Sequence, residues 1–128
     1  MSARRCEGPV LRILVVDDEP DLRYVLRRVF ERAGYEVADS GNGVTALESV
    51  RGSPPDLVVT DMMMPVMGGA ELIRRLRADP ATARIPILAV TGDAHLAHGA
   101  DAVLAKPCAS RSLLAAATAL IAQKADRK

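Results

Sequence analysis

The chain has 128 residues, 49% apolar and 26% charged, which suits one globular domain with an ordinary core and leaves no room for a second. Its 17 basic and 16 acidic residues give a formal net charge of +1 and form no basic stripe, which argues against electrostatic capture of DNA. No stretch approaches the roughly 20 consecutive apolar residues of a membrane helix, and residues 1–10 hold no apolar segment of signal-peptide length, so we expect a cytoplasmic protein.

The first half of the chain alternates between strand and helix patterns. After a flexible tail over residues 1–9, the apolar run over 11–16 predicts a strand that leads directly into Asp17 and Asp18. Pro20 suits the first turn of a helix, and Gly34 ends it. A weaker strand over 35–40, a turn over 41–43 and a short helix over 44–51 follow. The first helix has apolar residues at i, i+3 and i+4 spacing, which predicts a buried stripe of Leu22, Val25, Leu26, Val29 and Ala33.

The second half continues the alternation. A strand over 56–60 leads into Asp61, and Gly68 and Gly69 precede a helix that reaches residue 78. Strands over 86–90 and 101–105 lead into Thr91 and Lys106. A last helix begins near residue 110, and the domain spans residues 10–124, with a polar tail over 125–128. The expected buried residues of the last helix are Leu113, Leu114, Ala117, Leu120 and Ile121.

This order of strands and helices predicts an α/β fold with a doubly wound parallel sheet. Crossovers between parallel strands are right-handed, and helices divide between the two faces of such a sheet. The carboxyl ends of the strands then share one edge, which is where open α/β sheets bind ligands. We therefore expect Asp17, Asp18, Asp61, Thr91 and Lys106 to meet at that edge.

Three carboxylates close together repel one another and favour a divalent cation among them. Magnesium prefers oxygen ligands and is commonly shared between one or two carboxylates and a phosphate. Lys106 would attract a phosphoryl oxygen, and Thr91 would donate a hydrogen bond to another. Asp61 is left as the nucleophile, because a carboxylate can attack phosphorus to give an acyl phosphate.

In these motifs the chain resembles the receiver domain of two-component response regulators, over about residues 10–124. Asp17-Asp18-Glu19-Pro20 resembles the acidic metal-binding turn of that family. The segment over 61–69, which opens with Asp61 and continues through Pro65 to Gly68 and Gly69, resembles its phosphoacceptor segment. Thr91 and Lys106-Pro107 match its switch hydroxyl and its lysine with the following proline. Each motif is weak alone, and their joint order is specific.

The resemblance implies a flavodoxin-like five-stranded sheet in the order 2-1-3-4-5. It implies that Asp61 accepts a phosphoryl group from a histidine kinase or histidine phosphotransfer protein in a Mg²⁺-dependent reaction. Asp17, Asp18, Asp61 and the backbone carbonyl of Met63 would then bind the metal, and the peptide bond before Pro107 would be cis. Signalling would proceed through changed protein contacts with an unknown target, with no separate substrate turnover and no direct contact with nucleic acid or membrane.

Two departures from the family pattern stand out. Fewer residues separate Thr91 from Lys106 than is usual, by about two helical turns, so the helix before the fifth strand is stunted or absent. Val103 stands where the family commonly has Tyr or Phe. Val is stiff about χ1 and carries no ring. Switching is therefore expected to involve backbone shifts between Thr91 and Gly99.

Several simpler interpretations compete with these. Asp18 and Glu19 suit the positive end of a helix dipole, and the four methionines over 62–67 suit core packing. His95 and His98 stand at i, i+3 without a third ligand, which favours surface histidines over a zinc pair. Cys6 and Cys108 are expected to be two reduced thiols.

Two other functions remain open. The first is a receiver-like binding module that works without phosphorylation, against which the complete acidic cluster argues. The second is a phosphohydrolase with an aspartyl intermediate, but haloacid-dehalogenase-type enzymes place an acid-base Asp where this chain has Met63, which cannot transfer protons. Because little sequence follows the last helix, a stand-alone response regulator is the leading expectation.

Overall fold

The computed structural model describes residues 10–126. Its strands form one five-stranded parallel sheet in the order β2-β1-β3-β4-β5, which confirms the expected topology. The elements in chain order are β1 (Arg12–Val16), α1 (Pro20–Arg32), β2 (Glu36–Ser40), α2 (Gly43–Gly52), β3 (Leu57–Thr60), α3 (Gly69–Ala78), β4 (Ile87–Thr91), the 3₁₀ turn η2 (Ala94–Leu96), β5 (Ala102–Ala105) and α4 (Ser110–Asp126).

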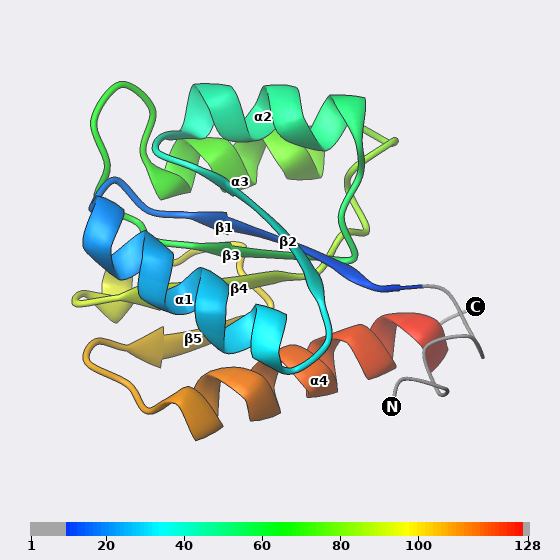
Figure 1. Ribbon diagram of the computed structural model, residues 1–128. Coiled ribbons are helices and arrows are strands. Elements are labelled where there is room, and N and C mark those ends of the chain that lie inside the picture. Colours follow the sequence, from blue (N-terminus) through cyan, green and yellow to red (C-terminus); the bar gives the residue numbers. More distant parts are fainter. Residues whose placement is uncertain (1–9, 127–128) are drawn as a thin grey trace.

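Helices cover both faces of the sheet, as a doubly wound fold requires (Figure 1). α1 and α4 lie on one face, and α2 and α3 lie on the other. Alternate residues of β1 enter the two cores, so that Val15 packs toward α1 and Val16 toward α2 and α3. β3 and β4 are buried along their whole length, whereas the edge strands β2 and β5 are only partly buried. Central parallel strands covered on both faces are expected to be apolar throughout.

The buried stripe of α1 differs from the expected one. Leu26 and Phe30 are its buried residues, and Phe30 is fully enclosed with an edge-to-face contact to Tyr35 at 6.2 Å between ring centroids. Val25 is 52% exposed and Ala33 is also exposed, so both expectations were wrong. The stripe follows i, i+4 spacing through Leu26 and Phe30. Val25, one position before Leu26, is rotated by about 100° from that line.

In α4 the expected stripe is close to the observed one. Leu113, Ala117 and Leu120 are buried against the sheet, and Leu114 and Ile121 are partly buried beside them. The helix continues to Asp126, two residues past the domain boundary expected from the sequence.

The tail expected over 1–9, which includes Cys6, and residues 127–128 lie outside the described residues. Within the described part of the chain, no helix is both long enough and apolar enough to cross a bilayer.

The connection between β4 and β5 holds only the single turn η2, which confirms that a helix is stunted at this point. Ala97 is buried in the core beside α3 and Ala100 packs partly against it, so the short segment fills part of the space over the sheet. Gly99 has φ of 89°, and a Cβ added there would lie 2.8 Å from Cγ2 of Ile73. Only glycine combines that backbone conformation with such a close approach.

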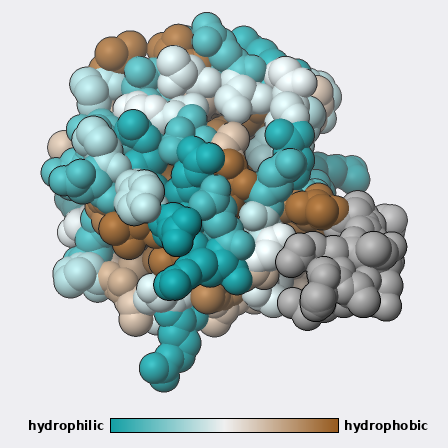
Figure 2. All heavy atoms as spheres, in the orientation of Figure 1, coloured by the Kyte–Doolittle hydropathy of each residue, from teal (hydrophilic) through white to brown (hydrophobic). Residues whose placement is uncertain are grey.

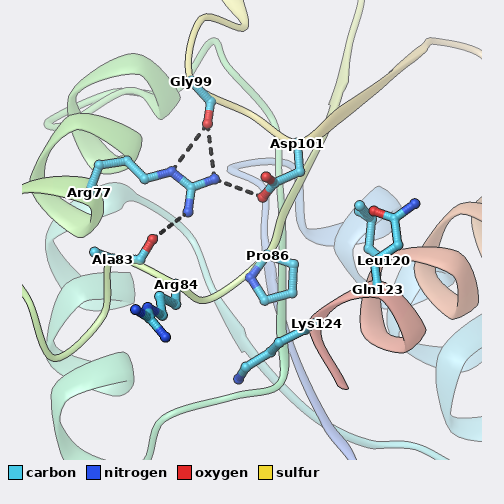
Figure 3. Close-up of a pocket in the computed structure, with 9 residues that line it drawn as sticks. All are labelled: Arg77, Ala83, Arg84, Pro86, Gly99, Asp101, Leu120, Gln123 and Lys124. Atoms are coloured by element: carbon cyan, nitrogen blue, oxygen red, sulfur yellow. Dashed lines mark hydrogen bonds and ion pairs between the residues drawn. The ribbon is translucent and has the colours of Figure 1, made fainter. Parts of the chain in front are cut away.

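Arg77, at the end of α3, ties this short connection to the rest of the fold (Figure 3). Its guanidinium donates hydrogen bonds to the carbonyl oxygens of Ala83, Ile85 and Gly99 at 2.8 to 3.2 Å. It also pairs at 2.7 Å with the carboxylate of Asp101, which accepts a hydrogen bond from the amide of Ile87. All five donors of a guanidinium are then in use. The amino-terminal ends of β4 and β5 are therefore held to α3 by one side chain.

Arg77, Ala83, Gly99 and Asp101 also line a hollow of about 270 Å³ at this edge of the sheet, between the end of α3 and the end of α4. Arg84 and Lys124 both line it, and Figure 3 shows Arg84 to the left of Pro86 and Lys124 below it. β4 and β5 begin at this edge, so the hollow is at the opposite end of the strands from the predicted acidic site. On the face of the molecule that carries α1, Figure 2 shows mainly hydrophilic residues, with apolar residues in small separate patches.

Candidate functional site

The residues at the carboxyl ends of the strands are placed by the sheet itself. Asp17, Asp61 and Lys106 each come directly after the last residue of a strand. The amide of each donates to a carbonyl of the neighbouring strand: Asp17 to Ser40 (3.1 Å), Asp61 to Val16 (2.9 Å) and Lys106 to Thr91 (3.0 Å). The hydrogen-bond ladder thus continues one residue beyond the strands and fixes where these side chains start.

Asp17, Asp18 and Asp61 form an acidic cluster. One carboxylate oxygen from each lies within 4.8 Å of the others. Asp17 and Asp61 are buried, with 1% and 8% of their surface exposed, whereas Asp18 is exposed. Negative charges this close and this poorly hydrated repel one another and require nearby positive charge.

Lys106 supplies part of that positive charge. Its Nζ lies 3.2 Å from Oδ2 of Asp17 and 3.2 Å from Oδ2 of Asp61. Partial burial alone would lower the pKa of Lys106, but the hydrogen bond to Asp61 and the charges of both carboxylates outweigh it, so the pKa is raised above its ordinary value. Lys106 is therefore a firmly charged ammonium group.

Backbone hydrogen bonds orient the two buried carboxylates. Oδ1 of Asp17 accepts from the amide of Glu19 at 2.9 Å. Oδ1 of Asp61 accepts from the amides of Met62 at 2.7 Å and Met63 at 3.4 Å. In both residues the other oxygen, Oδ2, faces Lys106. One oxygen of each carboxylate is thus held by the turn that follows it, and the other is paired with the ammonium group of Lys106.

The other predicted site residues lie at the same edge. Thr91 is buried at the end of β4, the strand between β3 and β5, and its hydroxyl accepts a hydrogen bond from the amide of Asp93 at 3.2 Å. Met63 stands in the turn after Asp61 with its side chain exposed. The peptide bond between Lys106 and Pro107 is cis, as the resemblance implies.

The cluster fits a hard divalent cation. Its donors are carboxylate oxygens, two of them buried and preoriented, and the cluster holds more negative charge than Lys106 alone can balance. Oxygen donors of this kind suit Mg²⁺. Among the described residues, this is the group of possible ligands that comes together, and neither His95 nor His98, both exposed, belongs to it. Partial burial raises the pKa of the nearby Cys108 thiol, which fits an inert cysteine.

Two residues near the site make contacts that the sequence did not predict. Gly69 begins α3, and a Cβ added there would lie 2.4 Å from the carbonyl oxygen of Asp61. Arg23 in α1 donates to the backbone carbonyl of Asp17 at 2.6 Å. The glycine pair and the basic residue one turn after Pro20 were visible in the sequence, but their contacts depend on how the elements pack.

Comparison with known proteins identifies this arrangement. The profile of the response regulator receiver domain matches residues 13–118, which is most of the chain. The chain belongs to the response regulator receiver family. Receiver domains are signalling modules of two-component systems, and they bind Mg²⁺ in general.

Relatives of this receiver domain include regulators of mycobacteria. The chain is 38% identical over 119 residues to the DNA-binding response regulator MtrA of Mycolicibacterium smegmatis, covering 90% of this chain and 52% of that protein. It is 42% identical over 118 residues to the response regulator MprA of Mycobacterium sp. strain KMS, covering 87% of this chain and 50% of that protein. This receiver domain therefore spans about half the length of these relatives.

A solved structure has the same fold over nearly the whole chain. It is the crystal structure of a CheY-like response regulator receiver domain protein from Methanospirillum hungatei JF-1, with a TM-score of 0.87 and 26% sequence identity. The match covers 94% of this chain and 100% of that one. The stunted connection between β4 and β5 therefore leaves the overall receiver fold intact.

Proposed function

We propose that this receiver domain accepts a phosphoryl group on Asp61 from the phosphohistidine of a histidine kinase or phosphotransfer protein. A carboxylate oxygen of Asp61 attacks phosphorus, the new O–P bond forms, and the imidazole of the donor leaves with the electron pair of the broken N–P bond. The observation that supports this best is the position of Lys106, 3.2 Å from the carboxylates of both Asp61 and Asp17.

The residues around Asp61 have separate roles in this proposal. Lys106 stays protonated and draws a phosphoryl oxygen toward itself, and the Thr91 hydroxyl donates a hydrogen bond to a second oxygen. Asp17, Asp18, Asp61 and the backbone carbonyl of Met63 hold Mg²⁺. The bound ion supplies positive charge that reduces the repulsion between the carboxylates and the incoming phosphoryl group. No turnover of a separate substrate is part of the proposal.

The output of the domain is a changed surface for a protein partner. Moving a two-state switch from 1:99 to 99:1 requires about 5.5 kcal/mol of differential stabilisation. The attraction of one lysine for a phosphoryl oxygen at 4 Å is about 4 kcal/mol at an effective dielectric constant of 20, and the gain on phosphorylation is smaller because Lys106 is already paired with Asp17 and Asp61. Contacts from both Lys106 and Thr91 are therefore needed. With Val103 in place of an aromatic ring, the change runs through the backbone between Thr91 and Gly99.

The proposal is tested by incubation with acetyl phosphate and Mg²⁺, followed by intact mass measurement. The wild-type protein is expected to gain one phosphoryl group, and the gain should disappear in EDTA and in Asp61→Asn. Asp79→Asn is the matched control, because Asp79 lies at the far end of α3 and its carboxylate accepts only from the nearby amide of Ala81 among the described contacts.

The same experiment also tests the alternative function, a receiver-like module that binds partners without phosphorylation. That module would show no adduct on the wild-type protein under conditions in which a control receiver domain is modified. The acidic cluster is the observation that disfavours it, because a pocket with no phosphoryl chemistry gains nothing from holding three repelling carboxylates together.

A further inference from the structure

Arg23 connects α1 to the turn that carries the acidic pair. Its Nη1 donates a hydrogen bond to the backbone carbonyl oxygen of Asp17 at 2.6 Å. Its Nε lies 3.9 Å from Oδ2 of Asp39, near the end of the neighbouring strand β2. The side chain is 23% exposed, so much of it is withdrawn from water. Arg23 is thus held between α1, the β1–α1 turn and β2.

Gly41, just after β2, leaves room for this guanidinium. A Cβ added to Gly41 would lie 3.2 Å from Nη1 of Arg23, which is a tight contact. The glycine therefore leaves the space that the guanidinium occupies when it reaches the carbonyl oxygen of Asp17. A hydrogen bond from a charged donor that is partly withdrawn from water is stronger than one between neutral groups in water.

The carbonyl of Asp17 belongs to the peptide unit that joins Asp17 to Asp18. A peptide unit is planar, so the direction of its carbonyl also sets where the Cα of Asp18 and its side chain begin. Asp17 itself is held by its amide, by Glu19 and by Lys106. Asp18, in contrast, is exposed, and its carboxylate makes no hydrogen bond or ion pair with the described residues.

We propose that Arg23 is a positioning residue for the cation site: by holding the Asp17–Asp18 peptide unit, it keeps the carboxylate of Asp18 within reach of Asp17 and Asp61. This inference rests on the Mg²⁺ site of the proposed function. Arg23 does not touch the cation or the phosphoryl group. It acts through the backbone on a ligand whose carboxylate has no partner within residues 10–126.

The positive charge of Arg23 acts against Mg²⁺ binding, whereas its positioning of Asp18 favours Mg²⁺ binding. A guanidinium beside an acidic cluster repels an incoming cation, so if charge alone mattered, removing Arg23 would tighten Mg²⁺ binding. If positioning matters more, removing Arg23 weakens binding. The direction of the change therefore separates the two effects.

The test is Mg²⁺ binding by isothermal titration calorimetry at fixed ionic strength. Arg23→Gln is expected to weaken binding by about tenfold, the usual size of an effect from a residue that orients a ligand. Arg23→Lys keeps a charged donor and should stay within about threefold of wild type. The matched control is Arg28→Gln, an exposed residue of the same helix with the same change of charge, which should leave binding the same or slightly tighter.

A double-mutant cycle excludes a merely structural effect. If Arg23 acts through Asp18, then Arg23→Gln should cost little further affinity in an Asp18→Asn background. Unfolding in EDTA verifies that each variant is folded, and Arg23→Met, which keeps the apolar stem, replaces Arg23→Gln if the latter does not fold. Wild-type affinity or tighter binding in the folded Arg23 variant overturns the inference, and so do additive losses in the cycle. Absence of Mg²⁺ binding by the wild-type protein would instead refute the proposed cation site itself.

Discussion

The ammonium nitrogen of Lys106 lies 3.2 Å from Oδ2 of Asp61, although the two residues follow strands that are not neighbours. β4 stands between β3 and β5, so the lysine side chain reaches across the end of β4, where Thr91 is buried. The positive charge that is proposed to bind a phosphoryl group therefore lies beside Asp61 in the unmodified protein, and the Thr91 hydroxyl stands at the end of the strand next to β3.

Lys106→Gln should destabilise the metal-free protein by about 1–2 kcal/mol, because it leaves two buried carboxylates without their counter-charge and the lysine itself is partly solvated. The raised pKa of Lys106 means that its stabilising contribution is complete below its ordinary pKa of 10.5 and is lost as the pH rises through the higher pKa of the folded state. Urea unfolding of both proteins in EDTA, at neutral pH and near pH 11, measures this. Equal stability at neutral pH would show that the ion pairs contribute nothing net.

Gly69→Ala should distort the backbone that carries Asp61. The added Cβ would lie 2.4 Å from the carbonyl oxygen of Asp61 and 2.8 Å from Cα of Met62, and both belong to the backbone. We expect a loss of about 1–3 kcal/mol in unfolding free energy and a slower gain of the phosphoryl group from acetyl phosphate. Gly52→Ala is the control, because it meets no heavy atom within 4 Å. If both variants behave alike, the close approach at Gly69 has no energetic consequence.

Phe30→Ala should cost about 3–5 kcal/mol of unfolding free energy, whereas Val25→Ala should change it by no more than about 0.5 kcal/mol. Phe30 is fully buried and Val25 is 52% exposed on the same helix. Chemical denaturation of the two variants measures the difference. A larger loss for Val25→Ala would restore the stripe expected from the sequence.

The contrast between Phe30 and Val25 also shows which features could be predicted from the sequence and which could not. The strands and helices followed from apolar spacing, because each element packs against a single sheet and its pattern is local. The gathering of Asp17, Asp61 and Lys106 followed from their places after parallel strands. Which residues of α1 face the sheet depended on the helix rotation, and the stripe expected from apolar spacing included Val25 and left out Phe30.

Long-range side-chain contacts could not be predicted from the sequence. Arg77 and Arg23 look like ordinary charged residues of amphipathic helices. Nothing in their spacing indicates that Arg77 anchors the β4–β5 connection or that Arg23 binds the backbone of the acidic turn. The order of the strands came from the resemblance to receiver domains, because the alternation of strands and helices by itself is compatible with more than one doubly wound order.

Arg77→Gln should loosen the short connection between β4 and β5. The variant loses the ion pair with Asp101 and donors to three carbonyl oxygens, which we expect to cost about 1–3 kcal/mol. Amide hydrogen exchange should accelerate over residues 83–87 and 99–102. Arg75→Gln is the control, because its ion pair is with Glu71 on the exposed side of the same helix. Unchanged exchange over both segments would contradict the anchoring role of Arg77.

The central claim is that one edge of the sheet forms a single Mg²⁺ and phosphoryl site, and a titration with Mg²⁺ and beryllofluoride, a phosphoryl mimic, tests it most directly by residue-resolved NMR. We predict saturable, Mg²⁺-dependent shifts in the amides around Asp61 and Lys106, together with backbone shifts between Thr91 and Gly99. No saturable shifts at these residues, or shifts confined to other parts of the protein, would contradict the account.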